Sequence, residues 1–176
     1  MRFEPTAVDG VWLVKAEPSV DHRGAFVRFA CERTLADRGL VGHFRQTSLS
    51  ISRRRGTLRG MHYQAAPHAE VKLVRCVRGG VQDVVVDLRP ESPTYLRSAS
   101  YELSAANQLA LYMPEGCAHG LLTLEDDCHV LYQINVEHAP DAARGVRWND
   151  PAFAIDWPFG PVEISTRDAG YPDYAR

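Results

Sequence analysis

The chain has 176 residues, of which 45% are hydrophobic and 24% are charged, and its formal net charge at pH 7 is -2. This composition is typical of a globular protein with a sizeable core, and it excludes the disordered and fibrous classes. The slightly negative charge argues against electrostatic capture of nucleic acid, but local clusters of arginine and lysine leave room for a small anionic ligand.

The cysteines and the apolar segments indicate the cellular compartment. Cys31, Cys76, Cys117 and Cys128 form no C-x-x-C motif, which favours reduced thiols in a cytosolic protein. Residues 1–21 lack the apolar core and cleavage site of a signal peptide. No apolar run approaches the roughly 18 residues that a membrane span needs. We therefore expect a cytoplasmic protein that spans no membrane.

Short strand-like runs dominate the chain, and several alternate apolar and polar residues with period two. In chain order we expect a strand, one helix and then eight further strands, at residues 25–29, 32–38, 44–52, 57–64, 71–79, 81–89, 97–104, 109–114, 120–124 and 128–136. The pair Gly79-Gly80 predicts a β-hairpin turn between two of these strands.

About nine short strands separated by turn residues are typical of an all-β antiparallel sandwich or jelly roll. Residues 1–176 contain no linker or repeat, so we expect a single domain of this class with a few short helices. The proline- and aromatic-rich end, from about Asn149, predicts an ordered strap over the body, with Trp148 and Trp157 as its anchors.

The segment RGTLRGMHYQ, residues 55–64, combines arginines and glycines with one histidine. An arginine suits an anion, and a histidine suits proton transfer. Regular alternation would place His62 and Arg59 on opposite faces of the strand, unless Gly60 introduces a bulge. A hydrogen-bonded histidine beside a solvated arginine fits this pattern equally well.

Three further positions have both a functional and an ordinary interpretation. Lys72 lies in the apolar run VKLVRCV, where it is either buried and binds an anion or is exposed to solvent on an edge strand. His119 follows the shaped loop PEGCAHG, which either aims the histidine inward or is only a turn. Tyr132 lies on an apolar strand, where a tyrosine most often packs in the core.

A metal site is the main chemical alternative. His62, His68, Glu70 and His119 are similar to the ligand set of metal-binding cupins. However, position 64, where a second histidine would share the strand face of His62, is glutamine, and His68 lies beyond a proline. We therefore expect no metal. The sequence also contains no P-loop and no dinucleotide-binding fingerprint.

Read together, several segments resemble one family, the dTDP-4-dehydrorhamnose 3,5-epimerases, which are cofactor-free enzymes with the cupin fold. The resemblance runs in order from residue 21 to residue 168. It rests on DHRGAFVRF, RGTLRGMHYQ, KLVRCVRGGVQDVVVDLRPESPTY, ELSAANQLALYMPEGCAHGLLTL, LYQ, RGVRWNDPAFAIDWP and ISTRD. It implies a cupin-like jelly roll that forms a homodimer by exchanging N-terminal strands. It also implies an epimerase that acts at C3, C5 or both of a nucleotide-linked 4-keto-6-deoxyhexose, in deoxysugar biosynthesis.

The resemblance also implies roles for individual residues. His62 matches the base that removes a carbon-bound proton, and Asp168 matches its acidic partner. Lys72 matches the cation beside the C4 oxygen, and Tyr132 matches the acid on the opposite face of the sugar ring. The implied substrate-binding residues are Arg23 (from a neighbouring subunit), Phe26, Gln46, Ser48, Arg59, His119 and His138.

The chain departs from the family pattern at the nucleotide end of the site. Arg28 stands where many relatives carry glutamate, Ser48 where asparagine is usual, and His138 where a stacking tyrosine is usual. These departures leave open whether the nucleotide is dTDP, CDP or GDP, and which carbons are inverted. The alternatives to the epimerase are a metal-dependent cupin oxygenase or isomerase and a non-catalytic nucleotide-sugar binding module.

Overall fold

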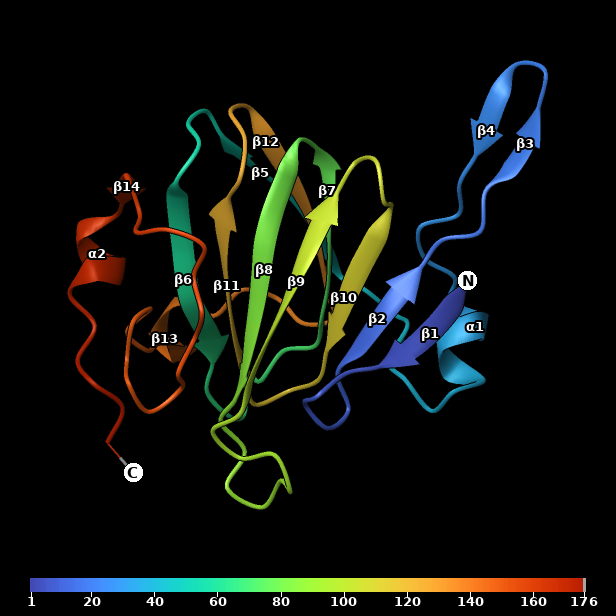
Figure 1. Ribbon diagram of the computed structural model, residues 1–176. Helices are drawn as coiled ribbons and strands as arrows, with labels where there is room; N and C mark the ends of the chain where they lie inside the picture. Colours follow the sequence, from blue (N-terminus) through green and yellow to red (C-terminus); the bar gives the residue numbers. More distant parts are fainter. Residues whose placement is uncertain (176) are drawn as a thin grey trace.

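The computed structural model describes residues 1–175, and its body is a sandwich of two six-stranded, largely antiparallel sheets (Figure 1). The strand order of the first sheet is β1-β2-β10-β7-β12-β5. The order of the second sheet is β13-β6-β11-β8-β9, and a sixth strand, β14, pairs with β6. The architecture confirms the predicted all-β, jelly-roll class.

The first sheet consists of β1 (Arg2–Pro5), β2 (Trp12–Lys15), β10 (Leu109–Met113), β7 (Lys72–Arg78), β12 (Cys128–Ile134) and β5 (Gln46–Ser52). The second consists of β13 (Ala143–Gly145), β6 (Thr57–Gln64), β11 (Cys117–Thr123), β8 (Gly80–Asp87), β9 (Ser98–Ser104) and β14 (Glu163–Ile164). The remaining elements are β3 (Ser19–Asp21), β4 (Gly24–Phe26), α1 (Glu32–Ala36), a 3-10 turn (Pro140–Ala142) and α2 (Thr166–Ala169).

The core lies between the sheets, and a second apolar layer covers the outer face of each. Val74 and Val130 of the first sheet pack with Val85 and Leu121 of the second. A cluster that includes Leu35 of α1 covers the outer face of β7 and β10, and the segment after β13 covers the outer face of β8. Strands buried on both faces read as nearly continuous apolar runs, which explains the sequence of β8.

The hairpin predicted at Gly79-Gly80 is wrong. Strand β7 pairs with β10 and β12, whereas β8 pairs with β9 and β11, so the two glycines carry the chain from one sheet to the other. Gly79 has a φ of +73°, and a Cβ there would lie 2.7 Å from Cys128 Sγ. Glycine is required by this crossing, but a glycine pair does not reveal which sheet the next strand joins.

The strand predicted at residues 25–29 is also wrong in its extent. The chain forms a short hairpin from β3 and β4, which projects from the body (Figure 1). Its apolar side chains are largely outside the core, since Val20 is 75% exposed and Phe26 is 73% exposed. The other predicted strands and the helix are confirmed within three residues at each end. The short strands β1, β2, β3, β13 and β14 were missed.

A charged cluster holds the loop between β8 and β9. The buried carboxylate of Asp87 accepts hydrogen bonds from the side chains of Arg89, Ser92 and Thr94. Burial alone would raise the pKa of Asp87, but these hydrogen bonds outweigh it and lower the pKa to about 2. The carboxylate therefore stays charged at neutral pH and fixes the turn that begins at Pro90.

The two tryptophans predicted as anchors of the strap after β13 contact each other, and Trp157 also packs against the apolar layer over β8. Trp157 Nε1 donates to the carbonyl of Trp148 at 2.9 Å, and the ring centroids lie 6.3 Å apart. The cysteines are all free, and all but Cys31 are buried, as the prediction of unpaired thiols requires. Within residues 1–175, no helix is sufficiently long and apolar to span a membrane.

Candidate active site

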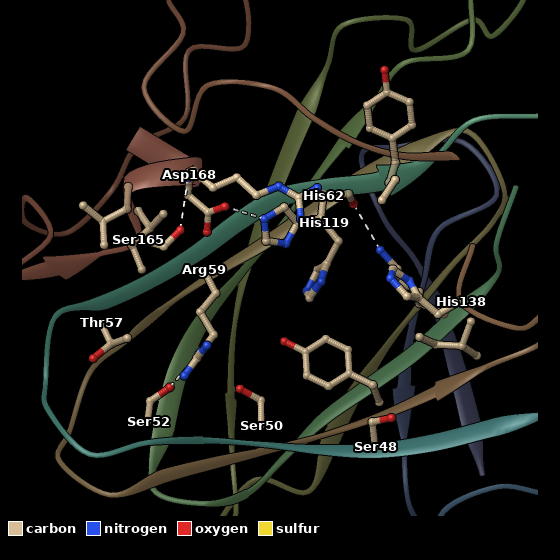
Figure 2. Close-up of a pocket in the computed structure, with 18 of the residues that line it drawn as sticks. Ser48, Ser50, Ser52, Thr57, Arg59, His62, His119, His138, Ser165 and Asp168 are labelled. Atoms are coloured by element: carbon tan, nitrogen blue, oxygen red, sulfur yellow. Dashed lines mark hydrogen bonds and ion pairs between the residues drawn. The ribbon is translucent and has the colours of Figure 1, made fainter. Parts of the chain in front are cut away.

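A cavity of about 850 Å³ opens between β5, β7 and β12 of the first sheet and β6 and β11 of the second, beside α2 (Figure 2). Side chains from both sheets and from the C-terminal helix therefore face the same space. It is lined by most of the residues predicted for the site, namely Ser48, Arg59, His62, Lys72, His119, Tyr132, His138 and Asp168.

A β-bulge brings Arg59 and His62 to the same cavity. Between these two paired positions β6 has two residues, Gly60 and Met61, whereas the facing strand has only Gly120. Gly60 has a φ of +131°, and a Cβ there would lie 2.4 Å from Gly120 Cα, so only glycine fits. Met61 points into the apolar layer on the outer face of the second sheet instead. Regular alternation would have placed Arg59 and His62 on opposite faces of β6, and that expectation is wrong. The bulge considered at Gly60 is present, and it places both side chains on the cavity face.

His62 is hydrogen-bonded to the carboxylate of Asp168, with 2.7 Å between Nε2 and Oδ1 (Figure 2). The backbone N–H of Gly60 donates to the other oxygen, Oδ2, at 3.1 Å. Ser165 is the N-cap of α2 and accepts from the backbone N–H of Asp168, which fixes where the helix presents the carboxylate.

The charge of Asp168 decides which histidine nitrogen is basic. Burial alone would raise the pKa of Asp168, but hydrogen bonding and charge interaction with His62 and the Gly60 N–H lower it overall. An ionised carboxylate can only accept, so Nε2 of His62 must carry a proton. In the neutral imidazole, Nδ1 is then the nitrogen with a free lone pair.

Lys72 lies inside the site, so the edge-strand interpretation is wrong. Its Nζ donates to the carbonyl of His62 at 3.1 Å and lies 2.8 Å from Glu70 Oε1. The Lys72 and Glu70 side chains are only 8% and 10% exposed. Glu70 was considered in the sequence only as a metal ligand, and its pairing with the lysine was missed. The Glu70 carboxylate therefore balances the positive charge of the Lys72 ammonium at the cavity wall.

Tyr132 and His119 lie edge to face, with 5.7 Å between ring centroids. His119 Nε2 is 2.9 Å from Asp83 Oδ2, and Asp83 is fully buried. Burial raises the pKa of Tyr132 well above its ordinary value, and the charge of Asp83 raises it further. The phenol therefore stays protonated at neutral pH. Asp83 was missed in the sequence, although an aspartate within the apolar run VQDVVV was a usable signal.

The cavity has a polar, cationic end. Arg59 donates through Nε to Ser52 Oγ at 3.0 Å and through Nη2 to the Ile51 carbonyl at 3.2 Å. Alternate residues of β5 present hydroxyl groups along this wall (Figure 2). The lining also includes guanidinium groups that were not predicted as site residues, namely Arg53, Arg144 and Arg167; of these, Arg53 belongs to the local basic cluster that left room for an anionic ligand. Guanidinium groups in such a setting suit phosphate oxygens.

Some predicted binding residues are not in this cavity. Gln46 lies at the start of β5 opposite Ile134 and is not part of the cavity lining, and its role in substrate binding stays a prediction. Arg23 pairs with Asp21 in the projecting hairpin, and Phe26 lies exposed on the same hairpin (Figure 1). One chain alone therefore does not bring Arg23 and Phe26 to its own site.

The residues of the metal interpretation do not gather. His68 is exposed and lies outside the cavity lining, whereas His62 and His119 bind separate carboxylates. Within residues 1–175, no three histidine, cysteine, aspartate or glutamate side chains are placed to hold a metal ion. The arrangement does not favour the metal alternative.

Comparison with known proteins agrees with this geometry. Residues 5–176 match the family model described as dTDP-4-dehydrorhamnose 3,5-epimerase. The enzyme of that name from Sinorhizobium fredii is 38% identical over 98% of this chain and 89% of its own length. A dTDP-4-dehydrorhamnose 3-epimerase from Streptomyces niveus is 38% identical over 96% of this chain and 81% of its own length. A crystal structure of the Bacillus anthracis 3,5-epimerase with TDP and PPi bound superposes with a TM-score of 0.94, at 35% identity, covering 98% of this chain and 99% of that one.

Proposed function

This chain belongs to the dTDP-4-dehydrorhamnose 3,5-epimerase family, and we propose that it inverts C3, C5 or both of a nucleotide-linked 4-keto-6-deoxyhexose. The observation that supports this most directly is the convergence of the His62–Asp168 pair, Lys72 and Tyr132 on one cavity. Binding alone would not need a base, a cation and a protonated phenol around the same space.

The chemistry starts at the C4 ketone of the substrate, which makes the hydrogens on C3 and C5 acidic. Nδ1 of His62 removes one of these protons, and the Asp168 carboxylate stabilises the imidazolium that forms. The electrons move onto the C4 oxygen, where the ammonium of Lys72 stabilises the enolate. This step needs no redox change and no group transfer.

Inversion requires the proton to return from the other side of the ring. We assign this step to Tyr132, whose raised pKa keeps the phenol protonated and able to donate to the carbon. A phenolate next to Asp83 would be unfavourable, so the tyrosine must take up a proton from solvent before the next turnover. The imidazolium of His62 must release the proton that it removed from carbon to solvent in the same interval. His119 supports this side of the site through its edge contact with the tyrosine ring.

The cationic end suits the diphosphate of a sugar nucleotide, with Arg59 as the main anchor. We propose dTDP as the nucleotide. Related enzymes are named for a dTDP-linked sugar, and the structure of one of them was solved with TDP and PPi bound. Ser48 and His138 line the same cavity and are the residues that would adapt it to the base. A relative is named a 3-epimerase, so inversion at C3 alone is one outcome of the experiment below.

The proposed reaction is tested by supplying dTDP-, CDP- and GDP-4-keto-6-deoxyhexoses in heavy water and locating deuterium by NMR. We expect deuterium at C3, C5 or both, with the dTDP sugar reacting fastest. Exchange with none of the three sugars would contradict the epimerase proposal. Calorimetric binding of the dTDP sugar without exchange would support the non-catalytic binding module instead.

We also propose that the chain is a single-domain subunit of a cytoplasmic homodimer. The projecting hairpin exposes Val20 and Phe26, and apolar side chains Leu49 and Ile51 are about half exposed on the edge strand β5. An interface would bury such groups, and the hairpin would bring Arg23 to the cavity of a second copy. Free cysteines support a reducing location.

The dimer is tested by light scattering of the purified protein. We expect a mass of twice 19.6 kDa, and a shift towards the monomer when Val20 and Phe26 are both changed to serine. Changing the exposed Lys15 on β2 to serine is the control and should leave the mass unchanged. A wild-type monomer with full epimerase activity would contradict the dimer.

A further inference from the structure

We propose that Tyr171, in the segment after α2, is a positioning residue that holds the imidazole of His62 in its working orientation and connects it to Arg167. The inference rests on the proposed function, because it takes His62 to be the base. The Tyr171 side chain is not part of the cavity lining, so its effect would pass through the residues that it contacts.

The first observation is the place that the Tyr171 ring occupies. Gly145 of β13 is the cross-strand partner of His62 on β6. A Cβ at Gly145 would lie 2.2 Å from both Cε2 and Cζ of Tyr171, so the tyrosine ring fills the space where a side chain of residue 145 would stand. The tyrosine ring therefore lies beside His62, and it fits there only because residue 145 has no side chain.

The second observation is the contact with the imidazole itself. The rings of Tyr171 and His62 lie edge to face, with centroids 6.3 Å apart and planes at 70°. The His62 side chain is 41% exposed, and within residues 1–175 its imidazole makes one hydrogen bond, to Asp168. A single hydrogen bond leaves a partly exposed ring free to tilt about it, and a rigid aromatic wall restricts that motion.

The third observation is the tyrosine hydroxyl, which accepts a hydrogen bond from Arg167 Nε at 2.7 Å. Arg167 lines the cavity and precedes Asp168 on α2. The same side chain thus has two separable contacts: its ring steadies the base, and its hydroxyl orients a guanidinium that faces the substrate space.

These two contacts predict different kinetic effects. Tyr171→Ala removes the wall, so kcat for isotope exchange should fall about tenfold, because small displacements of a base are costly. Tyr171→Phe keeps the wall and loses only the hydroxyl, so kcat should stay near wild type while KM rises a few-fold. Equal kcat in Tyr171→Ala and wild type would overturn the inference, as would an equal loss of kcat in both variants.

Gly145→Ala provides an independent test without changing the tyrosine. The new methyl group should displace the ring and lower kcat about as much as Tyr171→Ala does. In the Tyr171→Ala background, the same substitution should have little further effect, because no ring remains to be displaced. Additive losses in the double variant would show that the two residues act separately and would overturn the inference. Thermal unfolding of each variant identifies any general loss of structure.

A measurement that does not need turnover separates this inference from the proposed function. The imidazole signals of His62 in ¹⁵N-histidine-labelled protein, assigned by their loss in His62→Ala, should shift and broaden in Tyr171→Ala and stay unchanged in Tyr171→Phe. If wild type exchanges no deuterium but these signals behave as expected, only the epimerase proposal fails. If wild type is active and the signals do not respond to Tyr171→Ala, only the positioning role fails.

Discussion

Replacing His62 by alanine is expected to lower deuterium incorporation at C3 and C5 by between about 10² and 10⁴-fold. The variant lacks the only residue proposed to remove the carbon-bound proton, whereas the cation for the enolate stays in place. The rate is measured by NMR with the 4-keto sugar in heavy water. Affinity for the substrate should change little, because the diphosphate anchor at Arg59 is untouched.

The matched control for this prediction is His68→Ala, since His68 is exposed and lies outside the cavity lining. It should exchange at the wild-type rate. Loss of His62 also removes a hydrogen bond from Asp168, so His62→Gln, which restores a donor but not a base, checks that inactivity does not come from misplaced structure. Exchange at the wild-type rate in His62→Ala would refute the assignment of the base.

Changing Lys72 to methionine is expected to lower kcat by about 10² to 10³-fold, the usual cost of removing one oxyanion-stabilising donor. The effect has two parts in this structure. The ammonium that would stabilise the enolate is lost, and Glu70, normally 2.8 Å from Lys72 Nζ, is left as an uncompensated carboxylate in the site. A negative charge there would oppose the negative charge that develops on the substrate.

The double variant Lys72→Met/Glu70→Gln separates these two parts. It removes the uncompensated carboxylate, so it should be more stable to heat than Lys72→Met and should recover part of the activity, but not all of it. Lys15→Met, an exposed lysine on β2, is the control and should behave as wild type. A Lys72→Met enzyme with unchanged kcat would show that the C4 oxygen is stabilised elsewhere.

The strand periodicity predicted the fold class and most strands, because a sandwich face imposes period two on the residues that it buries. It did not predict the connection at Gly79, because glycine marks a change of direction and the choice of sheet depends on distant strands. It also missed β13 and β14, which have only three and two residues and exist through their pairing with β6. Their sequences alone contain too little pattern to detect.

The site was predictable in part. The residues by themselves left Lys72 undecided between an edge strand and the interior, and only the family resemblance connected it to His62 and Asp168. Glu70 and Asp83 were missed because their significance comes from partners on other strands. Tyr171 was missed for the same reason, since it meets His62 only after the C-terminal segment returns across β13 and β6.

The bulge at Gly60 shifts the alternation of side chains along β6 by one residue. Odd-numbered Arg59 before the bulge and even-numbered His62 after it therefore face the same cavity. Substitutions before the bulge can retune the hold on phosphate, and substitutions after it can retune the base, without either half constraining the other. An insertion or deletion between Arg59 and His62 would not be tolerated in the same way. Losing one residue would exchange inward and outward positions along half of the strand, so this short interval should accept new side chains far more readily than insertions or deletions.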